Sequence, residues 1–321
     1  MKNQDFQHWL GQTTQLTSHQ KLQATDELSG NPPNRLTEDQ LSEVSHCPHC
    51  ASSLFCHWGQ SNDLPRYRCK SCLKTFNALT GTPLARLRHK GQWMQYAETM
   101  IQSFSIRKAA RLVGIDKNTS FRWRHRFLMC PTLDKPEHLT GIVEADETFF
   151  LESHKGEKNL SRPARKRGGK AHKRGVSTEQ IPVLIMRDRS GVTSEAILPN
   201  VSADALAKVL IPILEPDAIL CSDGHRSYQA FARVSGIIHQ PVNLAAGIRV
   251  ADKAFHVQNV NAYDSRLKGW MQPFHGVATK YLDHYLGWRR WLDTHSKTMT
   301  AQEFLTEVAG ANGRYQQLMQ T

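Results

Sequence analysis

The sequence predicts a multidomain protein in which two small N-terminal modules precede a larger α/β domain. Three observations predict this organisation: paired cysteines in residues 46–80, apolar residues at helical spacing in residues 88–130, and strand-like runs alternating with helical patterns from residue 141 onward. With 321 residues, the chain is long enough for two or three domains and at least one sizeable hydrophobic core.

The charge balance indicates the kind of partner. The chain carries 41 lysines and arginines against 29 acidic residues, a formal net charge of +12, which favours polyanions such as nucleic acids. Residues 1–45 are polar, and their beginning lacks the apolar stretch of a signal peptide. No run approaches the roughly 18 apolar residues that a membrane span requires. We therefore expect a cytoplasmic protein without a membrane partner, whose seven cysteines are reduced.

The four paired cysteines predict a zinc ribbon in residues 46–80. Two C-x2-C pairs are separated by 18 residues, and each pair can form a tight turn that directs two thiolates at one ion. Four thiolates complete the tetrahedron of a closed structural Zn²⁺ site. The alternative is a group of ordinary buried cysteines. The predicted ligands are Cys47, Cys50, Cys69 and Cys72.

Residues 88–130 predict a small helical domain of the helix-turn-helix type. An apolar stripe occupies the first helix of the pair, and Gly114 supplies the turn. Asp116 or Asn118 can cap the second helix, which presents cations to a DNA major groove. The alternative is an ordinary helical hairpin with a solvated basic face. The predicted DNA contacts are Arg122, Arg124 and Arg126.

Two acidic residues interrupt apolar strands in the predicted α/β domain. Asp146 lies near the centre of the strand GIVEADETFF, and Asp223 ends the strand AILCSD. Glu144 shares the strand face of Asp146, whereas Glu147 points away. A carboxylate among strand apolars is costly unless it is paired or bound to a metal, although solvated strand ends are the plainer alternative. The helical segment QNVNAYDSRLKGW offers further polar residues along one face, namely Asn261, Asp264 or Ser265, and Lys268.

Taken in order, the cysteine pairs, the helix pair and three further segments resemble the transposases of bacterial insertion sequences. Those segments are VEADETFF, SDGHRSY and NVNAYDSRLKGWMQPFHGVATKYLDHYLGW. The resemblance covers about residues 45–295 and narrows to the group whose core reads D-D-N-K or D-D-E-K. It implies a ribonuclease H-like α/β domain over residues 141–295, with a mixed sheet flanked by helices. It also implies that Asp146 is the first acid, on the central first strand, and Asp223 the second, at the end of the fourth strand.

The same resemblance implies a site for two divalent cations, Mg²⁺ or Mn²⁺, held by Asp146, Asp223 and Asn261. Lys268, seven residues after Asn261, would contact a phosphate near the scissile bond. Related transposases carry glutamate where this sequence has Asn261, whose amide carbonyl brings no charge. Asp264, one helical turn later, can supply that charge, so it stays open which of the two completes the site.

The resemblance extends to a basic insertion at residues 155–175. Between Lys155 and Arg174 the sequence has nine lysines or arginines, and its glycines and proline predict a flexible loop. Such a loop would contact the DNA backbone without reading base sequence. Candidate contacts there are Arg165, Lys166, Arg167 and Lys170. Residues 296–321 are expected to form a C-terminal helical tail.

The expected function is that of a transposase that binds the ends of a mobile DNA element, hydrolyses phosphodiester bonds and joins those ends to target DNA. Its expected partner is double-stranded DNA, on which it acts as a homo-oligomer. One alternative is a DNA-binding regulator with an inactive nuclease-like domain, which Asn261 keeps open and the two intact acids disfavour. Another is a nuclease of the same fold that does not transpose.

Overall fold

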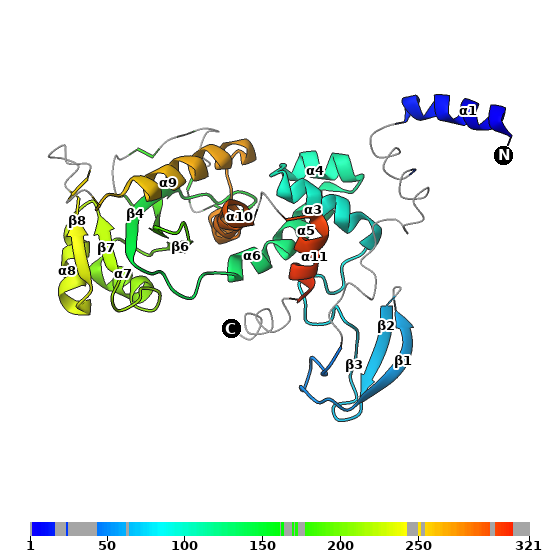
Figure 1. The fold of residues 1–321 in the computed structure, drawn as a ribbon, viewed down its shortest axis with the longest axis horizontal. Coiled ribbons are helices and arrows are strands. Elements are labelled where there is room, and N and C mark those ends of the chain that lie inside the picture. The colour runs from blue at the N-terminus through cyan, green and yellow to red at the C-terminus, as the bar shows by residue number, and fades with distance from the viewer. Residues whose placement is uncertain are drawn as a thin grey trace. The chain divides into compact units, whose positions relative to one another are not determined.

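The computed structural model of the chain forms two compact units, Met1–Phe127 with Met299–Thr321 and Leu128–Thr298 (Figure 1). The structure describes residues 2–16, 24, 44–61, 64–160, 162–163, 169, 171–172, 177–242, 250–251, 254–295 and 299–310. Four predicted DNA contacts lie outside the described residues, namely Arg165, Lys166, Arg167 and Lys170. Among the described helices, none has both the length and the apolar character needed to cross a membrane.

The first unit begins with helix α1 (Asn3–Gln12) and contains a small antiparallel sheet beside the paired cysteines. The strand order is β1 (Phe55–Ser61), β2 (Leu64–Cys69) and β3 (Thr75–Phe76). The core of this sheet is a handful of side chains, in which Phe76 packs edge-on against Phe55 with ring centroids 5.5 Å apart. A core this small buries too little apolar surface to be stable alone, so the sheet requires a further stabilising interaction.

Four helices form the main core of the first unit: α3 (Trp93–Ile101), α4 (Ile106–Val113), α5 (Lys117–Phe127) and α11 (Ala301–Gly310). Helix α4 begins where the side chain of Ser105 accepts the N–H of Lys108, and it ends at Gly114, whose φ of 70° favours glycine. The side chain of Asp116 caps α5 by accepting the N–H of Asn118 at 2.7 Å. The predicted helices and glycine turn are therefore present, and Asp116 rather than Asn118 provides the cap.

The last described helix, α11, packs on α3. Its buried residues include Leu305 and Val308, and its Phe304 ring lies 6.3 Å from the ring of Phe127 on α5. The periodicity of the C-terminal segment predicts a helix but no partner for it. The packing shows that residues 301–310 complete the helical core of the first unit.

The second unit is built around a five-stranded mixed sheet of order β6-β5-β4-β7-β8. Strands β4, β5 and β6 form an antiparallel meander, and β7 and β8 run parallel to β4. The sheet therefore has the predicted strand from the segment GIVEADETFF at its centre. The bounds are β4 (Ile142–Leu151), β5 (Gln180–Asp188), β6 (Thr193–Ile197), β7 (Ile219–Ser222) and β8 (Ile238–Pro241).

Helices cover both faces of this sheet (Figure 1). On one face, α7 (Ala203–Leu210) and α8 (Arg226–Ser235) pack against alternate residues of the strands, including Val143 and Ala145. On the other face, α9 (Gln258–Met271) and α10 (Leu282–His295) pack against the intervening residues, including Ile185 and Cys221. Because strand side chains alternate between faces, Glu144 and Asp146 project toward α9, and Glu147 projects toward α7 and α8.

A buried ion pair fixes the segment that leads into the second unit. Arg290 on α10 pairs with Glu195 on β6, and both side chains are at most 4% exposed. The same guanidinium donates to the carbonyl oxygens of Pro131 and Asp134, at the end of α6 (Met129–Leu133). A single arginine thereby binds carbonyls at the end of a short helix and one oxygen of the buried carboxylate of an edge strand.

Close packing of α10 on α6 depends on Gly287. A Cβ at this position would lie 2.7 Å from Thr132 Cα and 2.9 Å from the carbonyl oxygen of Pro131. Since both obstacles are backbone atoms, Gly287→Ala should lower the free energy of unfolding by about 1–3 kcal/mol. Urea denaturation of the full chain measures this loss. Gly269→Ala on α9, where nothing lies within 4 Å, is the matched control and should be neutral or stabilising. Equal effects of the two substitutions would contradict the packing argument.

Candidate functional site

Asp146 lies on β4, and Asp223 directly follows β7, the neighbouring strand. Strands β4 and β7 are parallel and pair Glu144 with Cys221, so the same register two residues further on brings Asp146 opposite Asp223. The N–H of His225 donates to Asp223 Oδ1 at 3.0 Å in the turn that begins α8. Gly224 allows this turn because its φ is +82°. The carboxylate therefore directly follows the strand, which ends at Ser222, and it is held at the carboxyl end of β7 near the first acid.

Helix α9 presents the third group of predicted residues. Asp264 and Lys268 are one turn apart, and Lys268 Nζ donates to Asp264 Oδ2 at 2.7 Å. Asn261 is exposed one turn before Asp264, on the same flank of the helix. This flank borders the buried stripe of Val260 and Leu267, which packs on the sheet. The helix thus carries an amide, a carboxylate and a lysine along the side next to Asp146.

The electrostatics of Asp146 connect these elements. Burial, followed by the charges of Glu147, Asp223 and Asp264 in that order, raises the pKa of Asp146 to about 7. Its Oδ1 accepts the N–H of Glu147 at 2.9 Å, which opposes this rise only in part. Carboxylates from β4, the end of β7 and α9 are therefore close enough to repel one another, and a cation between them would relieve that repulsion.

The donor set fits a hard divalent cation. Carboxylate and amide oxygens are the ligands that Mg²⁺ and Mn²⁺ prefer. Asp264 Oδ1 is buried and has no hydrogen-bond partner among the residues that the structure describes. The acids approach one another but do not form a complete set of metal ligands. Among the described residues, only the four cysteines place three or more histidine, cysteine or carboxylate ligand atoms within 4.8 Å of one another.

Glu147 occupies the opposite face of β4, as its position in the strand predicts. Its Oε1 accepts the O–H of Tyr228 at 2.6 Å, and burial raises the pKa of its carboxyl group. The Tyr228 ring stacks on His239, which in turn hydrogen-bonds the Ser222 hydroxyl at 2.8 Å. This chain of contacts braces the end of β7 next to Asp223. The sequence offered one signal for it, the tyrosine five residues after Asp223 in SDGHRSY.

The four predicted zinc ligands come together. The Sγ atoms of Cys47 and Cys72 lie 3.7 Å apart, and those of Cys50 and Cys69 lie 3.6 Å apart. A tetrahedral Zn²⁺ with Zn–S bonds of about 2.3 Å separates its sulfurs by about 3.8 Å, so the spacing fits the ion. The N–H of Cys72 contributes most to lowering the pKa of the Cys69 thiol to about 6, which favours the thiolate that a metal binds.

The three predicted arginines of α5 have different surroundings. Arg122 is exposed. The prediction for Arg124 is wrong, because its side chain has no exposed surface and donates to the carbonyl oxygen of Phe104 at 2.6 Å. Arg126 is half-buried and donates to the carbonyl oxygen of Pro83 at 2.7 Å. A DNA contact by Arg122 or Arg126 stays a prediction, whereas Arg124 belongs to the packing of the helices.

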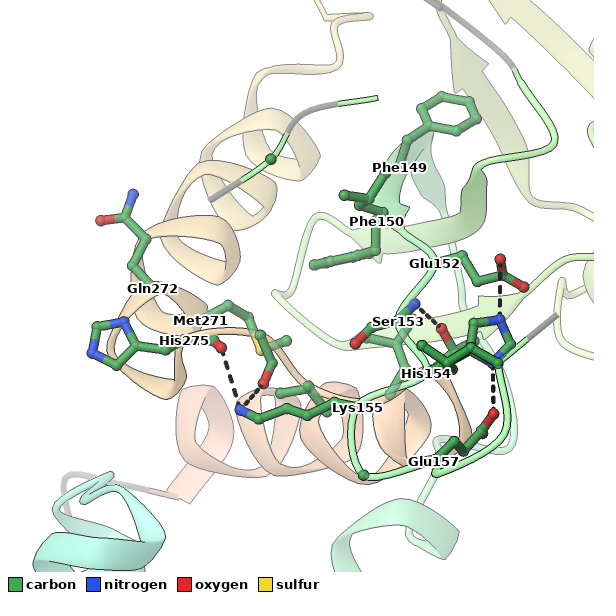
Figure 2. Close-up of a pocket in the computed structure, with 18 of the residues that line it drawn as sticks. Phe149, Phe150, Glu152, Ser153, His154, Lys155, Glu157, Met271, Gln272 and His275 are labelled. Atoms are coloured by element: carbon green, nitrogen blue, oxygen red, sulfur yellow. Dashed lines mark hydrogen bonds and ion pairs between the residues drawn. The ribbon is translucent and has the colours of Figure 1, made fainter. Parts of the chain in front are cut away.

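A cavity of about 940 Å³ opens beside Lys268, between the end of β4 and the end of α9 (Figure 2). Lys155, the first residue of the basic insertion, donates to the carbonyl oxygens of His275 and Gly276 at 3.3 and 2.7 Å. The N–H of Thr279 donates to the carbonyl oxygen of Ser153 at 2.8 Å. These bonds fasten the start of the insertion to the segment after α9, so that both line the same cavity.

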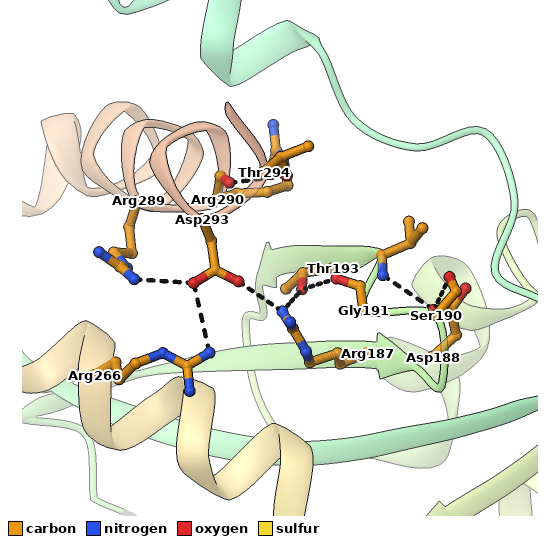
Figure 3. A network of polar contacts seen from close by, with 11 residues as sticks. Arg187, Asp188, Ser190, Gly191, Thr193, Arg266, Arg289, Arg290, Asp293 and Thr294 are labelled. Atoms are coloured by element: carbon orange, nitrogen blue, oxygen red, sulfur yellow. Dashed lines mark hydrogen bonds and ion pairs between the residues drawn. The ribbon is translucent and has the colours of Figure 1, made fainter. Parts of the chain in front are cut away.

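The opposite flank of α9 is tied to α10 and β5 through Asp293 (Figure 3). The Asp293 carboxylate accepts from Arg187 on β5 at 3.0 Å and from Arg289 on α10 at 2.9 Å. It also accepts from Arg266 on α9 at 3.5 Å. Because three cations share one carboxylate, this acid is the common anchor of the three elements.

Two sequence comparisons show which known proteins the chain is similar to. Residues 138–291 match the family model of the ISXO2-like transposase domain. The chain is 27% identical over 260 residues to an uncharacterized protein in the transposable element ISH50 of Halobacterium salinarum, which covers 79% of this chain and 86% of that protein. The domain match spans Asp146, Asp223 and α9.

Two solved structures of Mos1 transposase complexes are also similar. A pre-cleavage Mos1 transpososome aligns with a TM-score of 0.26 at 12% identity, covering 69% of this chain and 76% of that chain. A Mos1 paired-end complex with the left transposon end aligns with a TM-score of 0.27 at 12% identity, covering 68% and 75%. Similarity at this level does not establish a common fold.

The mixed sheet and its converging acids lie within the residues that match the ISXO2-like transposase domain. The chain is therefore similar to a protein of a transposable element, and its similarity to the ISXO2-like transposase domain covers residues 138–291.

The raised pKa of Asp146 predicts a pH-dependent stability. In the unfolded chain this group ionises near pH 4, so folding disfavours the carboxylate, and stability is lost as the pH rises from about 4 to about 7. Asp146→Asn removes the penalty and should stabilise the protein at pH 8 by about 1–3 kcal/mol, with a smaller gain at pH 5. Urea denaturation without added Mg²⁺ or Mn²⁺ measures the difference. The exposed Asp217→Asn is the control, and a pH-independent effect of Asp146→Asn would contradict the repulsion.

Proposed function

We propose that this protein binds the ends of its DNA element and catalyses metal-dependent phosphodiester hydrolysis and strand transfer. The observation that carries the proposal is the convergence of Asp146, Asp223 and Asp264 from two parallel strands and one helix. This convergence lies inside the ISXO2-like transposase domain. Acids that repel one another at the edge of a rigid sheet are suited to hold cations against a phosphodiester.

The residues of the candidate site would have different roles as metal ligands. Asp146 and Asp223 supply the charged oxygen ligands, and Asn261 and Asp264 are the candidates for the third. When bound, two Mg²⁺ or Mn²⁺ ions would activate the attacking hydroxyl and stabilise the leaving oxygen of an in-line displacement. The buried Oδ1 of Asp264 supports a direct part for this residue beside the exposed Asn261 amide.

Lys268 would contact the DNA backbone. Its side chain is 51% exposed and lines the cavity beside α9, while its Nζ is held by Asp264. A primary ammonium in this position can bind a phosphate oxygen next to the scissile bond. The Asp264–Lys268 pair would thereby couple the metal site to the position of the bound strand.

The first unit is proposed to recognise the DNA. The four cysteines would form a zinc ribbon, and α4 and α5 would form a helix-turn-helix with Arg122 and Arg126 toward the DNA. The basic insertion would add backbone contacts that carry no sequence information. Because an element has two ends to be processed together, we propose a homo-oligomer on the DNA.

The catalytic proposal is tested by single-turnover cleavage of a labelled element end in Mg²⁺ or Mn²⁺. Asp146→Asn and Asp223→Asn should each lower the cleavage rate by about 100-fold or more, because each removes a charged metal ligand. DNA binding in a gel-shift assay should be unchanged, and Asp217→Asn should cleave like wild type. Asn261→Ala should be milder than Asp223→Asn, and comparison with Asp264→Asn identifies the third ligand. Near wild-type cleavage by Asp223→Asn would contradict the catalytic proposal and favour the alternative function, a DNA-binding regulator with an inactive nuclease-like domain.

The zinc proposal has its own test. Elemental analysis should give about one zinc per chain, and Cys69→Ser should lose the metal and weaken DNA binding, because the small sheet depends on it. Cys56→Ser is the matched control, since Cys56 lies in the same sheet and its thiol only donates to the carbonyl oxygen of Arg68. Full zinc content in Cys69→Ser would exclude a four-cysteine site.

A further inference from the structure

Glu144 is a fully buried carboxylate whose contacts join the central strand to the first turn of α9. Its side chain is 0% exposed. Its Oε2 accepts the backbone N–H of Asn259 at 2.8 Å and that of Val260 at 3.0 Å. These are two of the N–H groups that a helix leaves without intrahelical partners at its start. A carboxylate there is a charge-assisted cap, favoured by the positive end of the helix dipole.

The other oxygen of Glu144 is held from a different element. Arg189, in the turn between β5 and β6, donates to Oε1, and His256 Nδ1 lies 3.3 Å from the same atom. Arg189 Nη2 also donates to the carbonyl oxygen of Ala254 at 2.8 Å. The carboxylate therefore fixes both the start of α9 and the segment that leads into it.

This cap lies next to the candidate metal site on both elements. Along β4, Glu144 precedes Asp146 by two residues on the same strand face. Along α9, the capped Asn259 precedes Asn261 by two residues, and Asp264 follows in the next turn. Any rotation or sliding of α9 against β4 would have to break the bonds to Glu144.

We propose that Glu144 is a positioning residue that sets the rotation and depth of α9, so that Asn261 and Asp264 face Asp146. The inference rests on the proposed function, because it assigns Glu144 to the same metal site. Glu144 itself would bind no metal, since Asn259, Val260 and Arg189 already occupy both of its oxygens. Its effect would reach the metal through the helix.

A second buried glutamate in the same sheet provides the control. Glu195 on β6 is 1% exposed and pairs with Arg290, as Glu144 pairs with Arg189. Its partner Arg290 binds carbonyl oxygens at the end of α6, away from the candidate metal site. Loss of either carboxylate should destabilise the fold, but only loss of Glu144 should displace α9.

The test compares Glu144→Gln and Glu195→Gln in the full, zinc-loaded chain. Glutamine keeps the shape of the side chain, but its amide nitrogen cannot accept a hydrogen bond, so all the bonds accepted by one of the two oxygens of Glu144 are lost. Mn²⁺ binding, followed by the electron paramagnetic resonance of the free ion, should weaken about 10-fold or more in Glu144→Gln. It should stay within about twofold of wild type in Glu195→Gln. Hydrogen exchange at the amides of Asn259 and Val260 should accelerate only in Glu144→Gln.

The outcomes separate the inference from the proposed function. Wild-type Mn²⁺ affinity in Glu144→Gln, or an equal loss in Glu195→Gln, would overturn the positioning role and leave the metal site intact. Unchanged Mn²⁺ binding in Asp146→Asn and Asp223→Asn would overturn the metal site itself, and the inference with it. If Glu144→Gln does not fold, Glu144→Asp is compared with Glu195→Gln instead. Aspartate keeps the negative charge, but its side chain is one methylene group shorter, so the carboxylate lies further from α9.

Discussion

Repulsion between carboxylates is the constraint on which the second unit depends. Asp146 is half-buried and lies near the charges of Glu147, Asp223 and Asp264, which raise its pKa to about 7 together with burial. A flexible chain would relieve such repulsion by moving the acids apart. Here two of them are fixed by the pairing of parallel strands and a third by a helix packed on the sheet. The acids therefore stay close together because the surrounding fold is rigid, and their combined negative charge favours the binding of a cation.

Two buried glutamates show how that rigidity is achieved. Each is paired with an arginine, and each arginine also binds backbone carbonyls of a segment far away in the sequence. Buried ion pairs contribute little net stability over apolar packing, but they fit only one arrangement of the elements that they join. Glu144 in this way fixes the position of the first turn of α9 against β4. Glu195, through Arg290, fixes the end of α6 at the start of the second unit. Asp293 has a similar role between α9, α10 and β5.

The sequence predicted those features that depend on local pattern. Alternation and turn residues located β4 to β7 but not β8, and the two acids were recognised because a carboxylate is unusual in or next to an apolar strand. Arg124 was misassigned for a geometric reason: residues two apart on a helix point about 200° apart, so Arg124 cannot share a face with Arg122 and Arg126. The cap by Glu144 was invisible because its partners lie 115 and 116 residues away. A local sequence pattern cannot indicate that a glutamate caps a helix that lies far away in the sequence.

The chain separates its two candidate metal sites by ligand chemistry as well as by position. Four thiols in the first unit provide soft ligands at tetrahedral spacing, which select zinc over magnesium. The acids of the second unit provide hard oxygen ligands, which suit magnesium or manganese. The small sheet beside the cysteines has few buried side chains, so zinc binding there would be coupled to folding. The sheet around Asp146 has apolar cores on both faces and needs no ion to fold. Under the proposed function, an ion would therefore enter and leave the acidic site without unfolding it.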